Sequence, residues 1–240
     1  MKVYLNSISG VSDAILSMFM SKRSWTPKLN LEIIDTYNKV YDKTGRKEVF
    51  YDTTDDAKVN DWLTKLFKWG KIHPTMLRFI DFSATVEGLH RGAQDDFDSH
   101  ARRLDNRIIR SSTRLATFGT EKSDFYKDKI LTYDEVFSVL DMTMPDKIVC
   151  NDITYIRTEN GYIEEQYVNN KDVKRGLYML SIPSNFIFKC NFAEWAHIVR
   201  ERDCNSHAAP ELRDMVEDIN AKLQNIFPQL DKDFWYNVKG

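Results

Sequence analysis

The chain has 240 residues, 34 basic and 36 acidic, and a formal net charge of −2. This length fits one domain with a sizeable core or two small domains, and we predict one domain. The near-neutral charge excludes a protein that its overall field draws onto nucleic acid or anionic membranes. Three cysteines far apart in sequence (Cys150, Cys190, Cys204) exclude a disulfide framework and a zinc site. With no signal peptide and no apolar run that could cross a bilayer, we expect a cytoplasmic protein.

The N-terminal residues are predicted to form a strand and then a helix. Residues 2 to 6 have the pattern of a short strand. Residues 11 to 20 predict a helix, and Ser12 or Asp13 is available to cap its free backbone N–H groups.

A loop, a helix and a strand are predicted next. Charged residues and turn formers dominate residues 42 to 56, which predicts a surface loop. Apolar residues recur at helical spacing from 59 to 69, and Gly70 is expected to end that helix. From 80 to 87 apolar and polar residues alternate, which predicts a strand with one buried face and one polar face.

A second β region is predicted from residue 147 to 168. Its Glu159-Asn160-Gly161 segment supplies the residues that a tight hairpin turn needs at positive φ, and we expect this hairpin to project from the main body. Residues 210 to 226 carry an apolar stripe and predict a long helix, which Ser206 or Asn205 would cap, with Pro210 in its first turn. Helices that alternate irregularly with a few strands indicate an α+β fold, with a central antiparallel or mixed sheet flanked by helices.

The densest basic cluster comprises five arginines: Arg102, Arg103, Arg107, Arg110 and Arg114. Were this segment helical, the last four would share one face, because steps of three and four residues return to the same side. Aspartates nearby are one means of neutralising that face: Asp95, Asp96, Asp98 and Asp105. A bound phosphate is the other, since guanidinium forks match phosphate oxygens. Both interpretations stay open.

A second region, residues 175 to 213, combines arginines with apolar and aromatic residues and predicts a pocket for a planar anion such as a nucleotide. The chain has no glycine-rich dinucleotide motif, P-loop, nucleophile elbow or zinc-protease motif, so binding must rest on side chains. His73 lies between a predicted helix and strand, where functional groups are often displayed. No histidine has the spacing of a metal ligand, and we predict no metal site.

The order of these motifs resembles that of the flavin-dependent thymidylate synthases, over about residues 60 to 225. The matching pieces are His73-Pro74-Thr75, Glu87-Gly88-Leu89-His90-Arg91, Ser112-Thr113-Arg114, Arg175, Asn191, Arg202 and Ser206-His207-Ala208-Ala209-Pro210-Glu211-Leu212-Arg213. The family's Arg-His-Arg signature has no direct counterpart here. Ala209 stands where the family has glutamine, and Ala193 where it has an arginine near the flavin.

The resemblance implies reductive methylation of dUMP to dTMP by a methyltransferase. NADPH would reduce bound FAD, methylenetetrahydrofolate would supply the one-carbon unit, and the reduced flavin would supply hydride. The resemblance also implies a single catalytic domain over residues 1–240 and a homotetramer whose sites are shared between subunits.

Residue roles follow from the resemblance. Ser112 would lie close to dUMP, Arg114 and Arg175 would hold its phosphate, and Arg202 would be the catalytic residue at the uracil edge. A guanidinium fixed there stabilises negative charge on N3 and O2 of the ring. The residues expected at the flavin are His73, Thr75, Arg102, Arg103, Asn191 and His197.

Two alternative hypotheses stay open. One is a divergent homologue that binds a pyrimidine nucleotide and catalyses another modification or none. The other is a nucleic-acid-binding module that uses the Arg103–Arg114 face. The neighbouring aspartates, the net charge of −2 and the lack of interleaved aromatic residues argue against this module, so we expect no nucleic-acid or membrane partner.

Overall fold

The computed structural model describes residues 1–43, 57–98, 107–111, 131, 133–158, 161–169, 182–203 and 209–239. Contacts between residues divide the chain into two compact units. Unit 1 comprises Met1, Glu87–Asp96 and Arg110–Phe186, and unit 2 comprises Lys2–Val86, Phe97–Ile109 and Ile187–Gly240.

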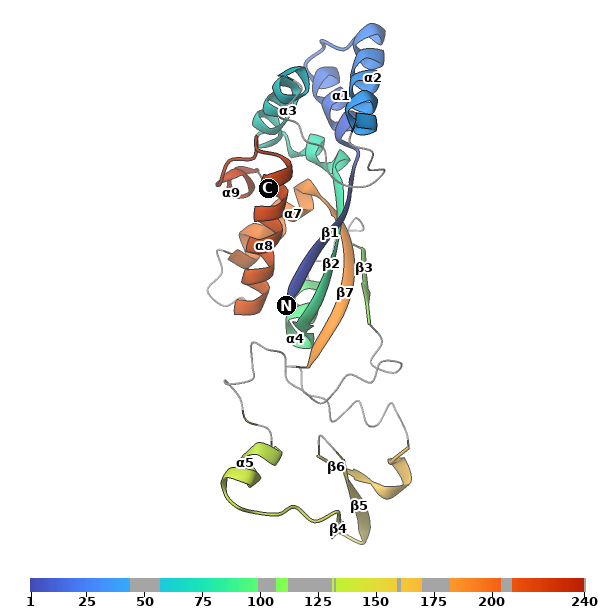
Figure 1. Ribbon diagram of the computed structural model, residues 1–240, viewed down its shortest axis with the longest axis vertical. Helices are drawn as coiled ribbons and strands as arrows, with labels where there is room; N and C mark the ends of the chain where they lie inside the picture. Colours follow the sequence, from blue (N-terminus) through green and yellow to red (C-terminus); the bar gives the residue numbers. More distant parts are fainter. Residues whose placement is uncertain are drawn as a thin grey trace. The chain divides into compact units, whose positions relative to one another are not determined.

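Four strands form the larger sheet, in the order β1-β2-β7-β3 (Figure 1). They are β1 (Lys2–Ser9), β2 (Asp81–His90), β3 (Arg107–Arg110) and β7 (Pro183–Asn191). Beside one end of β2 the Arg91 N–H donates to Ile182 O at 3.0 Å, and beside the other the Phe192 N–H donates to Ile80 O at 2.9 Å. Because numbering rises along one strand as it falls along the other, β2 and β7 are antiparallel.

A second, three-stranded sheet lies within unit 1. Its antiparallel strands are β4 (Lys147–Cys150), β5 (Ile153–Thr158) and β6 (Gly161–Glu164), accompanied by α5 (Tyr133–Val139) and the 3-10 helix η4 (Glu165–Tyr167). Thr158 pairs with Gly161, whose φ is 144°. The predicted hairpin is therefore confirmed, with β4 as a further strand, while residues 159 and 160 at its turn lie outside the described residues.

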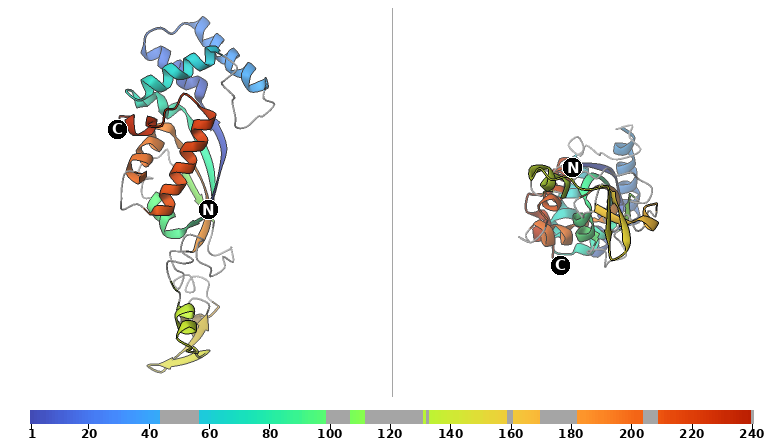
Figure 2. Two further views of the ribbon diagram at one scale, coloured as in Figure 1. Left: turned by 60° about the vertical axis from the view of Figure 1, so that its left-hand side comes forward. Right: turned by 90° about the horizontal axis from the view of Figure 1, so that it is seen from below.

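The remaining helices are α1 (Val11–Ser21), α2 (Pro27–Lys43), α3 (Ala57–Gly70), η2 (Pro74–Phe79), α4 (Arg91–Asp98), α7 (Phe192–Asp203), α8 (Pro210–Ile226) and α9 (Phe234–Asn237). Helix α7 packs against α8 and η2, and α8 packs on strand β1 (Figures 1 and 2). Helices α1 and α3 contact each other and η2. The α+β fold class, with an antiparallel sheet flanked by helices, is confirmed. None of the described helices is long and apolar enough to cross a membrane.

Aromatic rings fill the core of unit 2. Phe82 of β2 meets Trp195 of α7 edge to face, with ring centroids 5.3 Å apart. The other buried rings around them are Phe67, Phe97, Phe188, Phe192, Phe227, Phe234 and Trp235. Phe82, Ala84 and Val86 are all buried, so the alternating strand predicted from 80 to 87 is confirmed.

The predicted cap of α1 is wrong. The residue before the helix is Gly10, at φ 78°, and no side chain caps the end, so neither Ser12 nor Asp13 has that role. A Cβ atom on Gly10 would overlap the carbonyl oxygen of Phe79. Glycine stands here because the start of α1 touches the end of η2, a contact that local sequence does not reveal.

Helix α8 also begins differently from the prediction. Its N-cap residue is Ala209, which makes no capping hydrogen bond through its side chain, while the predicted capping residues Asn205 and Ser206 lie outside the described residues. Pro210 does open the helix, as predicted, because proline has no N–H to leave unsatisfied there.

Two further segments differ in detail. The predicted surface loop, 42 to 56, overlaps the end of α2, which runs to Lys43, and residues 44–56 lie outside the described residues. Gly70 is the last residue of α3, as predicted, but its φ is not in the left-handed region. A Cβ there would lie 2.7 Å from the Leu77 Cδ2, so close packing accounts for this glycine.

Candidate functional site

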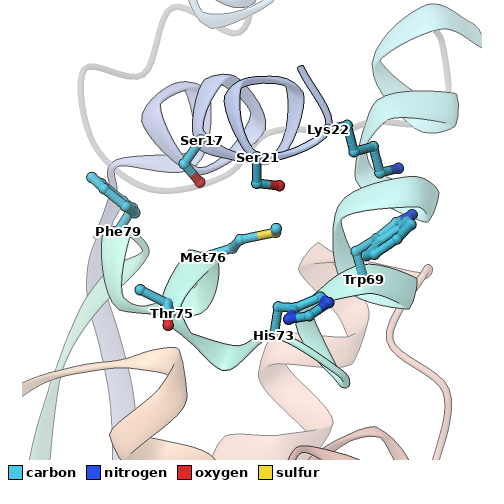
Figure 3. A pocket seen from close by; sticks show the side chains of 8 residues that line it. All are labelled: Ser17, Ser21, Lys22, Trp69, His73, Thr75, Met76 and Phe79. Atoms are coloured by element: carbon cyan, nitrogen blue, oxygen red, sulfur yellow. The ribbon is translucent and has the colours of Figure 1, made fainter. Parts of the chain in front are cut away.

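Three elements of unit 2 enclose a cavity of about 390 Å³: helices α1 and α3 and the 3-10 helix η2. Its lining comprises Ser17, Ser21, Lys22, Trp69, His73, Thr75, Met76 and Phe79 (Figure 3). Two of the residues predicted to contact flavin, His73 and Thr75, are therefore brought to one cavity. We call it the α1–η2 cavity.

His73 is held at the turn between α3 and η2. Its backbone N–H donates to Trp69 O at 2.8 Å, and its own carbonyl accepts from the Met76 N–H at 3.2 Å. Pro74 then opens η2, which has His73 as its N-cap. The imidazole stacks on the Trp69 indole, with centroids 5.5 Å apart and 15° between the planes. Backbone and ring contacts together orient the His73 side chain along the cavity wall.

A cation completes this wall. Lys22, the C-cap residue directly after α1, places its Nζ 4.4 Å from the centroid of the Trp69 ring, within the range of a cation–π contact (Figure 3). Burial lowers the pKa of Lys22, and the nearby charges of Lys65 and Lys68 lower it further. A bound anion would relieve this repulsion.

Helix α1 also offers hydroxyl oxygens to the cavity (Figure 3). Ser17 donates its proton to Ala14 O at 2.7 Å, and Ser21 donates to Met18 O at 2.9 Å. Each oxygen keeps lone pairs that can accept a hydrogen bond. Aromatic, cationic and accepting groups around one cavity suit a planar ring that carries an anionic group.

Three other predicted residues lie on helix α7 or directly before it, and none of them lines the α1–η2 cavity. Asn191 precedes the helix and its Oδ1 accepts the Glu194 N–H at 2.9 Å, so this buried side chain caps α7. His197 is half-buried on the helix. The structure thus gives Asn191 a structural role that the family pattern alone does not indicate.

Arg202 lies on the buried face of α7. Trp195, Ile198 and Val199, at helical spacing from it, are 0% exposed, and Arg202 itself is 8% exposed. A guanidinium keeps its charge when buried, and a low-dielectric surrounding strengthens its action on nearby charge. This burial agrees with an electrostatic role.

The arginine cluster does not form the helical face that its spacing suggested. Arg107 and Arg110 lie in strand β3 and not in a helix. Arg110 forms an ion pair with Asp95, and its Nη2 donates to Gln94 O at 3.0 Å. The interpretation in which an aspartate neutralises the cluster is correct for Arg110.

The remaining predicted site residues lie outside the described residues: Ser112, Arg114, Arg175, Arg102 and Arg103. Sequence reasoning missed Lys22 and Trp69. Trp69 had one usable signal, because it precedes His73 by one helical turn, but nothing in the spacing connects Lys22 with either residue.

Comparison with known proteins assigns the family. Residues 25–229 match the family model Thy1, described as thymidylate synthase complementing protein. The chain belongs to this family. The predicted membership is thereby confirmed and, at the level of the family, so is the predicted enzyme class: a flavin-dependent thymidylate synthase, which is a methyltransferase.

Solved structures agree on the fold of this Thy1 member. Two crystal structures of the flavin-dependent thymidylate synthase ThyX from Helicobacter pylori, both with FAD and dUMP, match with a TM-score of 0.52. Each is 13% identical to the chain and covers 100% of it and 98% of its own length. No curated protein sequence matches the chain.

Proposed function

We propose that this Thy1 family member is a flavin-dependent thymidylate synthase that methylates dUMP reductively to dTMP. The observation that carries the proposal is the α1–η2 cavity, where His73 stacks on Trp69 beside the Lys22 ammonium. These side chains suit the binding of a planar, negatively charged cofactor. The cavity lining also contains the His-x-Thr element of the family pattern.

The residues of the cavity fit part of FAD. Ligand cavities commonly measure about 300–1,000 Å³, and this one measures about 390 Å³, enough for a ring system but not for a whole dinucleotide. When bound, the flavin supplies hydride that originates from NADPH, and methylenetetrahydrofolate supplies the carbon. Trp69 and His73 would orient the ring and exclude water, and Lys22 would bind an anionic group.

Arg202 is proposed as the catalytic residue at the uracil ring. Negative charge that develops on N3 and O2 makes C5 more nucleophilic, and a fixed guanidinium stabilises that charge in the transition state. The burial of Arg202 on α7 supports this role, because folding orders and desolvates the side chain before the substrate binds. Ser112, Arg114 and Arg175 are proposed to hold dUMP, with the two arginines on its phosphate. Arg102, Arg103, Asn191 and His197 remain proposed flavin contacts.

We also propose a cytoplasmic homotetramer that uses residues 1–240 as one catalytic domain. Helix α5 has no buried residue and every residue of β4 is exposed, although both segments carry large apolar side chains. Tyr133, Val139 and Val149 are 75%, 76% and 70% exposed. Exposed apolar clusters of this kind mark contact surfaces, which supports assembly with further copies. Sedimentation would measure the oligomeric state directly.

The deciding experiment is tritium release from [5-³H]dUMP by protein supplied with FAD, NADPH and methylenetetrahydrofolate. Arg202→Ala should lower release at least a hundredfold at an unchanged fold, since the interaction matters mainly in the transition state. Arg200→Ala is the matched control, because Arg200 lies on the same helix and donates to Val238 O at 2.6 Å. Wild-type release in Arg202→Ala would refute the catalytic role.

The same preparation separates the alternatives. A protein that binds dUMP but neither takes up FAD nor releases tritium would be a divergent homologue with another reaction or none. Tight DNA binding with a steep salt dependence, without dUMP binding, would indicate a nucleic-acid module. The Arg110–Asp95 ion pair argues against the module, because it neutralises one arginine of the face that such a module would use.

A further inference from the structure

The α1–η2 cavity is smaller than the ligands that its walls suit. Its volume of about 390 Å³ accommodates a ring system, so the remainder of a dinucleotide or of a folate has to lie outside it. Lys22 contributes an ammonium group to the lining, at the side where this group lies over the Trp69 ring (Figure 3). An anionic tail would meet the protein first at this side.

Further lysines on helix α3 lie beside Lys22. Lys65, Lys68 and Trp69 are three and four residues apart, so they share one face of α3, and Lys22 lies over Trp69 on that face. Four residues of helix rise about 6 Å, which places these side chains within about one turn of each other. The charges of Lys65 and Lys68 act on Lys22 and, after burial, are the next causes that lower its pKa. Positive charge is therefore concentrated just outside the cavity.

Carboxylates neutralise most lysines of this helix and the residue after it, but not Lys68. Three lysines have acidic partners: Lys58 with Glu32, Lys65 with Asp61 and Lys71 with Asp231. Among the described residues, Lys68 and Lys22 form no ion pair. Two ammonium groups without a carboxylate partner thus lie on one side of the cavity, where the protein itself supplies no anion.

We propose that Lys22 and Lys68 form a subsite for the polyanionic tail of the ligand whose ring occupies the α1–η2 cavity. The tail carries at least two negative charges, passes Lys22 and meets Lys68 outside the cavity. Two kinds of tail have this chemistry: the phosphates of a flavin nucleotide and the glutamyl carboxylates of a folate. The inference rests on the proposed function, because it requires a planar ring in the cavity.

Lysine suits this role because its ammonium is a compact charge on a flexible stem, which can follow a tail that takes several courses. Lys68 is exposed, so water and salt weaken its action on the tail. We therefore expect a modest effect of Lys68 on affinity, about threefold, and a dependence of that effect on the charge of the ligand.

The first test uses riboflavin and FMN, which share one ring system and differ by a phosphate. Flavin fluorescence on the full chain should show FMN bound about tenfold more tightly than riboflavin. Lys68→Met should weaken FMN binding about threefold and leave riboflavin binding unchanged. Lys58→Met is the matched control, since Lys58 also lies over a tryptophan of α3, Trp62, at 5.4 Å, but is paired with Glu32. It should change neither affinity.

The second test uses pteroylmonoglutamate and pteroylpentaglutamate, with calorimetry to measure the affinities. If Lys68→Met weakens binding of the pentaglutamate more than that of the monoglutamate, glutamyl carboxylates occupy the subsite, whereas a selective loss for FMN assigns it to phosphate. The inference is overturned if Lys68→Met affects both members of each pair equally or affects none. Wild-type protein that binds these ligands in the expected order but releases no tritium from dUMP would refute the proposed function alone. Wild-type protein that binds none of the four would refute both.

Discussion

The His73 imidazole lies nearly parallel to the Trp69 indole, at 15° and with 5.5 Å between the ring centroids. Trp69 lies in the last turn of helix α3, and its carbonyl oxygen accepts the His73 backbone N–H, so Trp69 fixes both the backbone and the ring of His73. A histidine at this turn is thereby pre-oriented along the cavity wall before any ligand binds. Trp69 lies outside the motifs through which the chain resembles its family.

Replacing Trp69 should weaken flavin binding. Trp69→Leu removes the surface on which His73 stacks and the ring under Lys22, and we expect FAD affinity to fall about tenfold, since contacts of these two kinds contribute about 0.5–1.5 kcal/mol each. Quenching of flavin fluorescence measures the affinity. Trp25→Leu is the control, because Trp25 is 37% exposed and its Nε1 donates to Asn30, five residues further along the chain. Equal affinities in the two variants would contradict the role of Trp69.

Lys22 should make ligand binding depend on salt and pH. Burial and the charges of Lys65 and Lys68 lower the pKa of Lys22, and a bound anion favours the charged form and raises that pKa. Binding should therefore take up protons and weaken as pH rises through the pKa of free Lys22. In Lys22→Met both the pH dependence and the salt dependence of FAD affinity should flatten, while the exposed Lys28→Met keeps them. If FAD affinity depended equally on salt concentration in the wild type, Lys22→Met and Lys28→Met, Lys22 would not contact an anionic group of the ligand.

Local sequence patterns predicted those helices and strands that keep one buried face and one exposed face along their length. The alternation of β2 follows directly from one buried face, as Phe82 and Val86 show. The start of α1 could not be predicted, because Gly10 is required by the Phe79 carbonyl, which is distant in sequence. For the same reason the site was predicted only in part. His73 and Thr75 lie within one short motif, whereas Lys22 reaches Trp69 only through the packing of α1 against α3.

Two glycines should differ sharply in their tolerance of alanine. Gly10→Ala combines a left-handed φ of 78° with overlap of the Phe79 carbonyl oxygen, and backbone cannot move aside. In Gly70→Ala the new Cβ would lie 2.7 Å from the Leu77 Cδ2, and overpacking of this kind typically costs about 1–3 kcal/mol. We expect Gly10→Ala to lower the free energy of unfolding in urea by more than Gly70→Ala does. The reverse order would mean that α1 and η2 separate easily.

The two described cysteines should respond oppositely to a thiol reagent. Cys150 is exposed on β4, while Cys190 is fully buried. Burial raises the pKa of the Cys190 thiol, and the charges of Glu194 and Asp81 raise it further. Since the thiolate is the reactive form, Cys150 should be labelled in the native protein at pH 8 and Cys190 only after unfolding. Mass spectrometry of the labelled peptides distinguishes the two.

The same thiol should make stability fall in alkaline solution. A pKa raised by folding contributes stability that is complete below the unfolded value, about 8.5, and is lost as pH rises toward the folded value. Between pH 7.5 and 9.5 the loss should be on the order of 1 kcal/mol, since the unfolded chain gains a thiolate that the folded chain excludes. Urea unfolding at the two pH values measures the loss. Cys190→Ala should remove this loss of stability and Cys150→Ser should keep it, because of these two thiols it is the buried one that changes its environment on folding. If Cys190→Ala lost as much stability between the two pH values as the wild type, the effect would belong to other groups.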